Sequence, residues 1–310
     1  MGKQLSIIQA LDQTQPDAPP ADVGQPQANL DGYRSGFVGL LGRPNSGKST
    51  LLNAILGTKV AIVSNKAQTT RHAIRGVLHR DEAQVVFVDT PGIHKPKTAL
   101  GERLNATASG TAGDADVVCL CIDATRRLGK GDRFIASQLP KSSIVVVTKI
   151  DVASRTQVLS QLGVAGELGF AEYFPTSART GKGVAALVDK LCELMPAGPP
   201  LYPPDVVRDM PEAQWVAELV REQLLAATRQ ELPHAISVEV VEWEWPHIKV
   251  DISVERESQK PMVIGKGGSV LKQVGTAARA QLPDGAYLEL RVKVVKNWQR
   301  RPEMLDRFGY

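Results

Sequence analysis

The fold of this chain is indicated most directly by one segment of eight residues, Gly42-Arg43-Pro44-Asn45-Ser46-Gly47-Lys48-Ser49. The segment matches the pattern G-x-x-x-x-G-K-[ST] and lies between an apolar run, Phe37 to Leu41, and a helix-forming stretch, Thr50 to Leu56. Glycines let backbone N–H groups surround phosphate oxygens, and the N-terminus of the following helix adds a partial positive charge. We therefore expect a phosphate-binding loop in which Lys48 reaches the β- and γ-phosphates and the Ser49 hydroxyl binds Mg²⁺.

Short apolar runs alternate with helical segments from residue 36 to residue 195. Such runs are typical of strands buried on both faces, and their alternation with helices favours parallel pairing. The sequence therefore predicts an α/β fold of the P-loop NTPase type, with a doubly wound, mostly parallel sheet. The runs that we assign to strands are Phe37–Leu41, Val85–Val88, Val117–Ile122 and Ile144–Val147.

The 310 residues suggest two domains, since a domain has roughly 150 residues. Residues 1–34 are rich in Gln, Pro, Asp and Ala, and we predict a disordered tail because they cannot bury enough apolar surface to order. Residues 35–195 form the predicted nucleotide-binding domain. Residues 196–204 hold five prolines and are predicted to be a semi-rigid linker. Residues 205–310 form the second domain.

Composition excludes several classes of protein. The formal net charge is only +4, so a nucleic-acid surface must be a local patch. Three cysteines cannot form a disulfide framework, and Cys119 and Cys121 lie in an apolar run that is typical of a reduced core. No apolar stretch approaches the roughly 20 residues that a membrane span needs. We therefore expect an intracellular protein without a membrane-spanning helix.

The second apolar run ends in Asp89-Thr90-Pro91-Gly92, about forty residues beyond Lys48. An Asp at the end of a parallel strand beside a phosphate loop can hold magnesium, which we expect here through a water molecule. The Gly92 N–H can bond the γ-phosphate and sense its loss. The D-x-x-G pattern alone is usually just a turn, but its spacing from the phosphate loop favours a functional role.

The fourth run ends in Thr148-Lys149-Ile150-Asp151. The Asp151 carboxylate can accept hydrogen bonds from both N1–H and the 2-amino group of guanine, a pairing that adenine cannot offer. The Lys149 stem is expected to pack along the base, and the Ala178 N–H of Thr176-Ser177-Ala178 to reach guanine O6. Without the other motifs, this tetrapeptide would be interpreted as an ordinary solvated strand end.

In sequence order, these segments resemble the five motifs of the translation-factor-related GTPases. A further segment, Gln68-Thr69-Thr70-Arg71-His72, is similar to the switch-one segment of that family, which closes on magnesium. The resemblance implies that Thr70 is a magnesium ligand, with Thr69 as the alternative. It also implies that Lys48, Thr70 and Gly92 take part in catalysis.

Two positions depart from that pattern. The guanine motif of the family usually begins with Asn, and Thr148 stands there; its hydroxyl makes fewer bonds than an amide, so we expect reduced affinity or discrimination. Ile93 follows Gly92, where many signalling GTPases carry a water-orienting Gln. Intrinsic hydrolysis should therefore be slow, or depend on another group or on a partner.

Asn45 resembles an Asn that coordinates an activating potassium ion in several related bacterial GTPases. A monovalent cation there can offset charge between phosphates, as an arginine finger does. The alternative is an Asn that turn geometry favours. The sequence leaves both interpretations open.

Past the linker, the pattern changes to α-β-β-α-β: a helix at 213–229, strands at 235–244 and 248–255, a helix at 269–281 and a strand at 286–295. A G-x-x-G loop lies before the second helix. The chain contains six such matches, but only this one follows two strands, precedes a helix and has basic surroundings, with ten Lys or Arg and four Asp or Glu between Glu255 and Arg301.

That arrangement resembles a type II KH domain, a small α+β fold whose G-x-x-G backbone clamps single-stranded nucleic acid. The alternative is a small domain with a solvated basic face. The candidate RNA-binding residues are Ile264, Gly265, Lys266, Gly267, Gly268, Lys272, Lys293, Lys296, Arg300 and Arg301.

A GTPase domain followed by a KH domain resembles the Era family, over residues Gly36 to Tyr310. The motifs that support the resemblance are Gly42-Arg43-Pro44-Asn45, Gln68-Thr69-Thr70-Arg71-His72, Asp89-Thr90-Pro91-Gly92, Glu231-Leu232-Pro233 and Val263-Ile264-Gly265. The resemblance implies a GTPase that assists assembly of the small ribosomal subunit and binds 16S ribosomal RNA near its 3′ end. It further implies a cytoplasmic protein found partly at the inner face of the cell membrane.

Two expectations and two alternatives complete this interpretation. We expect GTP and GDP to switch RNA binding, and nothing in the sequence demands more than a monomer. One alternative is a nonenzymatic RNA-binding protein with a degenerate nucleotide site, which Thr148 and Ile93 favour. Another is a GTPase serving tRNA modification, which the Asn45 loop also suggests; it predicts a cofactor-binding or cysteine-bearing catalytic segment, and the sequence shows neither.

Overall fold

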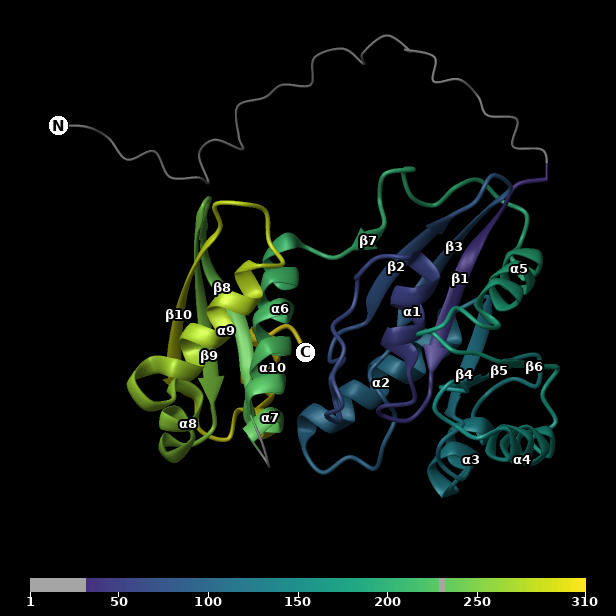
Figure 1. Cartoon of the computed structure of the whole chain (residues 1–310), viewed down its shortest axis with the longest axis horizontal. Helices are drawn as coiled ribbons and strands as arrows, with labels where there is room; N and C mark the ends of the chain where they lie inside the picture. Colours follow the sequence, from purple (N-terminus) through teal and green to yellow (C-terminus); the bar gives the residue numbers. More distant parts are fainter. Residues whose placement is uncertain (1–31, 229–231) are drawn as a thin grey trace, which may run out of the picture. The chain divides into compact units, whose positions relative to one another are not determined.

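The computed structural model describes residues 32–228 and 232–310 (Figure 1). Residues 1–31, which make up most of the tail predicted at 1–34, lie outside the described residues. Residues 229–231 also lie outside them, and they include Glu231 of the motif Glu231-Leu232-Pro233. The predicted disorder of the tail stays a prediction.

One large sheet is built from strands β1 (Arg34–Leu41), β2 (Ile74–His79), β3 (Ala83–Asp89), β4 (Val117–Asp123), β5 (Ile144–Thr148), β6 (Glu172–Pro175) and β7 (Arg208–Asp209). Within the described part of the chain it has seven strands in the order β6-β5-β4-β1-β3-β2-β7. β2 pairs antiparallel with β3 and β7, and the remaining pairs are parallel. The predicted doubly wound, mostly parallel sheet is therefore confirmed.

Helices cover both faces of this sheet: α1 (Lys48–Leu56), α2 (Ala99–Asp114), α3 (Lys130–Ser137), α4 (Arg155–Gly166) and α5 (Val184–Leu194). Leu40 and Leu41 are neighbours on β1, so their side chains point to opposite faces. Leu40 packs in a cluster with residues of α1 and α5, and Leu41 packs with residues of α3 and α4. Burial on both faces explains why these strands are continuous apolar runs rather than alternating ones.

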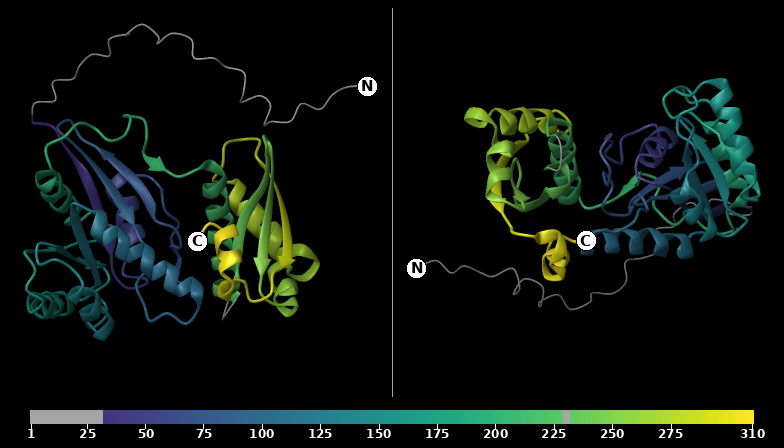
Figure 2. Two further views of the ribbon diagram at one scale, coloured as in Figure 1. Left: turned by 180° about the vertical axis from the view of Figure 1, so that it is seen from behind. Right: turned by 90° about the horizontal axis from the view of Figure 1, so that it is seen from below.

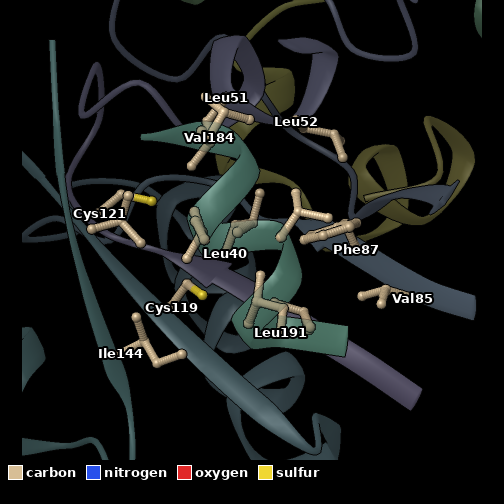
Figure 3. Packing of buried hydrophobic residues seen from close by; sticks show 14 of the residues in the cluster. Leu40, Leu51, Leu52, Val85, Phe87, Cys119, Cys121, Ile144, Val184 and Leu191 are labelled. Atoms are coloured by element: carbon tan, nitrogen blue, oxygen red, sulfur yellow. The ribbon is translucent and has the colours of Figure 1, made fainter. Parts of the chain in front are cut away.

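Figure 3 shows the first of these clusters, in which side chains from α1 and α5 point toward the strands. Cys119 and Cys121 lie within it and are buried and free. Burial raises the pKa of the Cys121 thiol to about 12. Both cysteines therefore behave as small apolar core residues.

The proline-rich segment 196–204 is held against the N-terminal ends of β1 and β3, two interior strands of the large sheet. Ser35 N donates to the carbonyl oxygen of Pro196 at 3.0 Å. The buried Gln84 side chain donates to the Tyr202 carbonyl at 2.8 Å and accepts from the Leu201 N–H at 2.6 Å. Beyond this segment, β7 pairs with β2, so the large sheet takes a strand from the stretch 205–310 that we assigned to the second domain.

A second sheet of the described residues holds β8 (Ser237–Glu244), β9 (His247–Val254) and β10 (Tyr287–Val294), in the order β10-β9-β8. Helix α6 (Glu212–Ala227) and helix α9 (Ser269–Arg279) pack on one face of it, through Val220, Leu224 and Val274 (Figure 2). This is the predicted α-β-β-α-β domain. Shorter helices complete it: α7 (Leu232–Ala235), η1 (Glu257–Gln259), α8 (Lys260–Ile264), η2 (Lys266–Gly268), η3 (Trp298–Arg300) and α10 (Pro302–Arg307).

No helix among residues 32–228 and 232–310 is both long and apolar enough to cross a lipid bilayer.

The core of the large sheet gives a test of the packing. Leu191 on α5 is fully buried, whereas Leu159 on α4 is 60% exposed. Leu191→Ala should lower the free energy of unfolding by about 2–5 kcal/mol, because it removes buried methyl groups and leaves a cavity. The matched change Leu159→Ala should cost less than about 0.5 kcal/mol. Urea denaturation followed by circular dichroism measures both, and equal costs would contradict this packing.

Candidate functional site

The phosphate loop connects the end of β1 to the start of α1. Gly42 has φ 147°, and a Cβ at this position would lie 2.5 Å from the carbonyl oxygen of Cys121. Gly47, with φ 91°, precedes the first residue of α1. These two glycines turn the backbone so that the free N–H groups at the N-terminus of α1 face the loop, as an anion-binding site requires.

Lys48 is buried at the base of this loop, with a relative exposure of 5%. Its Nζ donates to the carbonyl oxygens of Gly42, at 3.4 Å, and Arg43, at 3.3 Å. Burial lowers the pKa of Lys48, and the neighbouring Asp89 carboxylate opposes this effect. Because a desolvated ammonium is stabilised by a nearby anion, the site favours a ligand with several negative charges.

Three oxygen-bearing side chains meet beside Lys48. Ser49 Oγ donates to Asp89 Oδ2 at 2.5 Å, and Thr70 Oγ1 donates to the same oxygen at 3.2 Å. The Ser49 and Thr70 hydroxyl oxygens are 3.0 Å apart. Thr69, the alternative ligand, instead donates its hydroxyl to the Lys66 carbonyl at 2.8 Å. The fold therefore brings Thr70, and not Thr69, to Ser49 and Asp89.

This oxygen cluster fits a magnesium ion. Asp89 is fully buried, and its Oδ1 has no hydrogen-bond partner among residues 32–228 and 232–310. Burial raises the pKa of Asp89, while Lys48 and the hydrogen bonds from Ser49 and Thr70 act against the rise. Mg²⁺ prefers oxygen ligands and is usually held by one or two carboxylates together with substrate phosphates. Ser49, Thr70 and Asp89 supply that donor set.

A cavity of about 330 Å³ opens above these residues. Its walls come from the phosphate loop and Thr50, from residues between 62 and 70, and from Gly92, Arg126 and Lys149. A Cβ on Gly92 would lie 2.4 Å from the Pro44 nitrogen, so glycine is required for this close approach. Asn45 also lines the cavity, with φ 63°, and its Nδ2 donates to the Asn65 carbonyl at 2.8 Å.

A second cavity, of about 170 Å³, adjoins the phosphate loop on the side of β5. Asp151 and Ala178 line it. Asp151 accepts a hydrogen bond from Ser177 Oγ at 2.7 Å and forms an ion pair with the exposed Arg179 at 3.1 Å. The chain thus gathers the predicted guanine-recognition residues Asp151, Ser177 and Ala178 from two separate loops.

Thr148 and Lys149 tie this second cavity to the phosphate loop. The Thr148 hydroxyl donates to the Ser46 carbonyl at 2.7 Å, so the shorter side chain still reaches the loop backbone. Lys149 Nζ donates to the Asn45 carbonyl and to Asp123 Oδ2, each at 2.7 Å. Burial tends to raise the pKa of Asp123, but hydrogen bonds from Lys149 and Thr125 lower it below its usual value. Lys149 also has positive φ, at 61°.

Sequence reasoning missed Asp123. Its signal is that it ends the third apolar run just as Asp89 ends the second.

Four predicted motif residues have side chains with a structural role instead. Arg43 pairs with Asp132 at 3.3 Å, and Thr90 Oγ1 donates to the Leu40 carbonyl at 2.8 Å. Ile93 and Ile150 pack on the apolar cluster of α3 and α4. Pro91 is buried.

The G-x-x-G loop lies between α8 and α9. Gly265, Gly267 and Gly268 all have positive φ, at 77°, 58° and 79°. Lys266 and Lys272 are exposed beside the loop, and Ile264 is half-buried. This part of the predicted RNA-binding set is therefore contiguous.

The remaining basic candidates lie elsewhere. Lys293 on β10 forms ion pairs with Glu239 at 2.6 Å and Asp251 at 2.8 Å, and burial that would lower its pKa is outweighed by these partners, which raise it. On β10, it alternates with residues that pack on the cluster of α6 and α9, so it points to the other face of the sheet. The exposed residues Lys296, Arg300 and Arg301 follow β10.

Comparison with known proteins gives the family. Residues 37–149 match the family model described as "50S ribosome-binding GTPase", and residues 231–299 match the one described as "KH domain". "GTPase Era" of Mycobacterium sp. (strain KMS) is 50% identical over 296 residues, which cover 90% of this chain and 99% of that protein. This chain belongs to the Era GTPase family. "GTPase Era" of Mycobacterium tuberculosis (strain ATCC 25177 / H37Ra) is 48% identical over 297 residues, with the same coverage.

Two solved Era structures resemble this one. A crystal structure of Era in complex with MgGDPNP and nucleotides 1506–1542 of 16S ribosomal RNA has a TM-score of 0.85 and 40% sequence identity, and covers 90% of this chain and 99% of that chain. An Era variant from Aquifex aeolicus bound to GDP·AlF₄⁻ has a TM-score of 0.84, also at 40% identity, and covers 89% and 99%. The predicted Era resemblance and the P-loop GTPase and KH folds are confirmed.

The second cavity gives a test of base recognition. We expect Asp151→Asn to weaken GTP binding by about tenfold or more, because it removes a charge-assisted pair of hydrogen bonds to guanine. Xanthine carries a carbonyl at C2 in place of the amino group, and an Asn amide can donate to that oxygen. The variant should therefore bind xanthosine triphosphate more tightly than the wild type does.

Isothermal titration with GTP, ATP and xanthosine triphosphate measures this change. Asp189→Asn, at an exposed position on α5, is the matched control and should leave all three affinities unaltered. An Asp151→Asn protein that binds guanine and xanthine nucleotides like the wild type would remove Asp151 from base recognition.

Proposed function

We propose that this protein is a GTPase that binds 16S ribosomal RNA near its 3′ end through its KH domain and assists assembly of the small ribosomal subunit. One observation supports the proposal most strongly: a buried Lys48 beside the Ser49, Thr70 and Asp89 oxygens lies in the same chain as a G-x-x-G loop. The structure of Era in complex with MgGDPNP and 16S ribosomal RNA nucleotides aligns with 90% of this chain, and therefore with both of its domains.

In this proposal, Lys48 and the N–H groups of the phosphate loop bind the β- and γ-phosphates, and the Gly92 N–H bonds the γ-phosphate. Ser49, Thr70 and Asp89 would hold magnesium, the last through a water molecule. Bound magnesium supplies positive charge to the β- and γ-phosphate oxygens. Asp151, Ala178 and the Lys149 stem bind guanine.

We also propose that bound GTP favours RNA binding, because the segment beside Thr70 contacts the KH domain. The Arg71 guanidinium donates to the carbonyl oxygens of Ile236 at 2.6 Å and of His234 at 3.0 Å. Arg221 on α6 donates to the Thr69 carbonyl. His72 stacks on Tyr310, with ring centroids 4.9 Å apart. A change in Thr70 on loss of the γ-phosphate would alter these contacts.

For RNA recognition, we propose that Gly265–Gly268 clamps the RNA backbone and that Lys266 and Lys272 contact phosphates. Lys293 is expected to contribute less, because Glu239 and Asp251 already neutralise it. Lys296, Arg300 and Arg301 extend the basic surface toward the C-terminus. The cytoplasmic location, the peripheral membrane association and the monomeric state stay predictions.

The two alternatives make different predictions. A nonenzymatic RNA-binding protein would release no phosphate from GTP. Thr148 no longer favours this alternative, since its hydroxyl reaches the phosphate loop. A GTPase serving tRNA modification would bind tRNA rather than the 3′ end of 16S ribosomal RNA. Crosslinking to RNA in cells, followed by mapping of the bound site, separates this alternative from the main proposal.

Asn45 gives a test of potassium activation. Its Nδ2 is engaged by Asn65, which leaves its Oδ1 as a ligand for a monovalent cation. GTP hydrolysis should be about tenfold or more faster in potassium chloride than in sodium chloride, because a cation between the phosphates offsets their charge. Asn45→Ala should remove the difference.

Phosphate release at equal ionic strength measures this effect. Asn297→Ala is the matched control, because Asn297 has a similar φ of 53° but follows β10, away from the cavity. Equal rates of the wild type in the two salts would exclude a potassium role for Asn45.

Coupling between the two domains gives a further test. Single-stranded RNA with the 3′-terminal 16S sequence should bind the full chain several-fold more tightly with GDPNP than with GDP. His72→Ala removes the stacking on Tyr310. It should lower the ratio of the RNA affinity with GDPNP to the RNA affinity with GDP. His247→Ala is the matched control, since it removes a tilted ring contact with Tyr287, with centroids 5.0 Å apart, within the KH domain.

Fluorescence anisotropy of labelled RNA measures the affinities. Lys266→Ala should weaken binding in both nucleotide states and reduce its salt dependence, because one phosphate contact is lost. If the wild type bound RNA equally tightly with GDPNP and with GDP, the coupling would be excluded. The binding of nucleotide and the binding of RNA would each be unaffected by that result.

A further inference from the structure

Hydrolysis of GTP needs a group that orients the attacking water, and Ile93 does not supply it. Its side chain packs on the apolar cluster of α3 and α4, and its backbone N–H donates to the Gly42 carbonyl at 3.1 Å. Within the described residues, Ile93 lies outside the walls of the 330 Å³ cavity. Given the proposed GTPase function, on which this inference rests, another residue must orient the water.

Gln68 is in the right place. It lines the cavity together with Lys48, Thr70 and Gly92, which surround the expected γ-phosphate. Its backbone has φ 59°, a conformation that costs a non-glycine residue free energy. Among residues 32–228 and 232–310, four non-glycine residues have positive φ, and three of them, Asn45, Gln68 and Lys149, line this cavity. Such strain is concentrated at functional sites.

A chain of hydrogen bonds fixes which way the Gln68 amide points. His94 Nδ1 lies 3.1 Å from the Lys95 carbonyl oxygen, which can only accept, so Nδ1 carries a proton. In the tautomer with the proton on Nδ1, Nε2 is the acceptor, and it lies 2.5 Å from the Gln68 amide nitrogen, which can only donate. The amide nitrogen of Gln68 therefore faces His94, and its oxygen points elsewhere.

The Asn105 side chain fixes the His94 backbone through two hydrogen bonds. Its N–H donates to Asn105 Oδ1 at 3.3 Å, and its carbonyl accepts from Asn105 Nδ2 at 2.7 Å. Within the described part of the chain, Gln68 Oε1 receives no hydrogen bond from the protein. An oriented acceptor without a protein donor, on a residue that lines the cavity together with Lys48, Thr70 and Gly92, is what an attacking water needs.

We propose that Gln68 is a catalytic residue that accepts a hydrogen bond from the attacking water, and that His94 is the positioning residue that holds its amide. The water oxygen bonds to the γ-phosphorus while the bond from this phosphorus to the β–γ bridging oxygen breaks. The bridging oxygen leaves on GDP with the electron pair, and both protons of the water stay on the released phosphate, H₂PO₄⁻. Gln68 orients the water and takes no proton.

The test must separate this role from a structural role of the same residue. Gln68→Gly removes the amide and also relieves the left-handed backbone, so a purely structural role predicts an active protein. The catalytic role predicts that the single-turnover rate of GTP hydrolysis falls by about tenfold or more. Gln138→Ala, at an exposed position, is the matched control and should keep the wild-type rate.

The affinities of two ligands show whether Gln68→Gly weakens binding of the ground state or of the transition state. GDPNP should bind Gln68→Gly within about twofold of the wild type, whereas GDP with aluminium fluoride, which resembles the transition state, should lose its additional affinity. A variant that hydrolyses GTP at the wild-type rate, or that loses GDPNP affinity in parallel with the rate, would overturn the proposal. A wild-type protein that hydrolyses no GTP would instead contradict the proposed function itself.

His94 is tested by two substitutions. His94→Ala removes the acceptor of the Gln68 amide and should lower the single-turnover rate with little change in GDPNP affinity. His94→Gln restores an oxygen that can accept from this amide and should recover part of the rate. A rate in His94→Gln no higher than in His94→Ala would remove His94 from the positioning of Gln68.

Discussion

Two opposite charges, the Lys48 ammonium and the Asp89 carboxylate, are buried next to each other at the end of the large sheet, and the nucleotide site depends on them. Burial lowers the pKa of Lys48 and raises that of Asp89, and each group opposes the effect on the other. Their position follows from strand register, because β1 and β3 are parallel and Leu40 pairs with Asp89. The phosphate loop begins two residues after Leu40, so its lysine and this carboxylate must meet.

The same short segment of chain serves both the nucleotide and the RNA-binding domain. Thr70 faces Ser49 and Asp89, while its neighbours Arg71 and His72 contact the KH domain and Tyr310. Arg71 is 2% exposed, and its guanidinium lies over the ring of Trp298 with 5.5 Å to the centroid. A residue that is packed so closely cannot move without changing its neighbours. This connection gives the proposed effect of GTP on RNA binding a physical path.

Most of the fold and the centre of the site could be predicted, because the motifs act over a few residues. The phosphate loop, the D-x-x-G turn and the alternating buried strands each depend on local backbone geometry and on apolar periodicity. The ion pair between Asp123 and Lys149 could not be predicted. It joins the ends of two strands, and the sequence does not show the register in which these strands pair. The sequence shows the positive charge of Lys293, and this charge alone makes it a candidate for RNA binding. The sequence does not show that Glu239 and Asp251 form ion pairs with it.

The sequence alone therefore determined the P-loop GTPase and KH folds, the family and the residue types at the phosphate loop. Those features rest on patterns within single segments. Only the tertiary structure decided that Thr70 and not Thr69 reaches Ser49, that Ile93 turns into the core, and that Gln68 faces the cavity with His94 behind it. These contacts join residues from separate loops, and their geometry depends on how the whole sheet is packed.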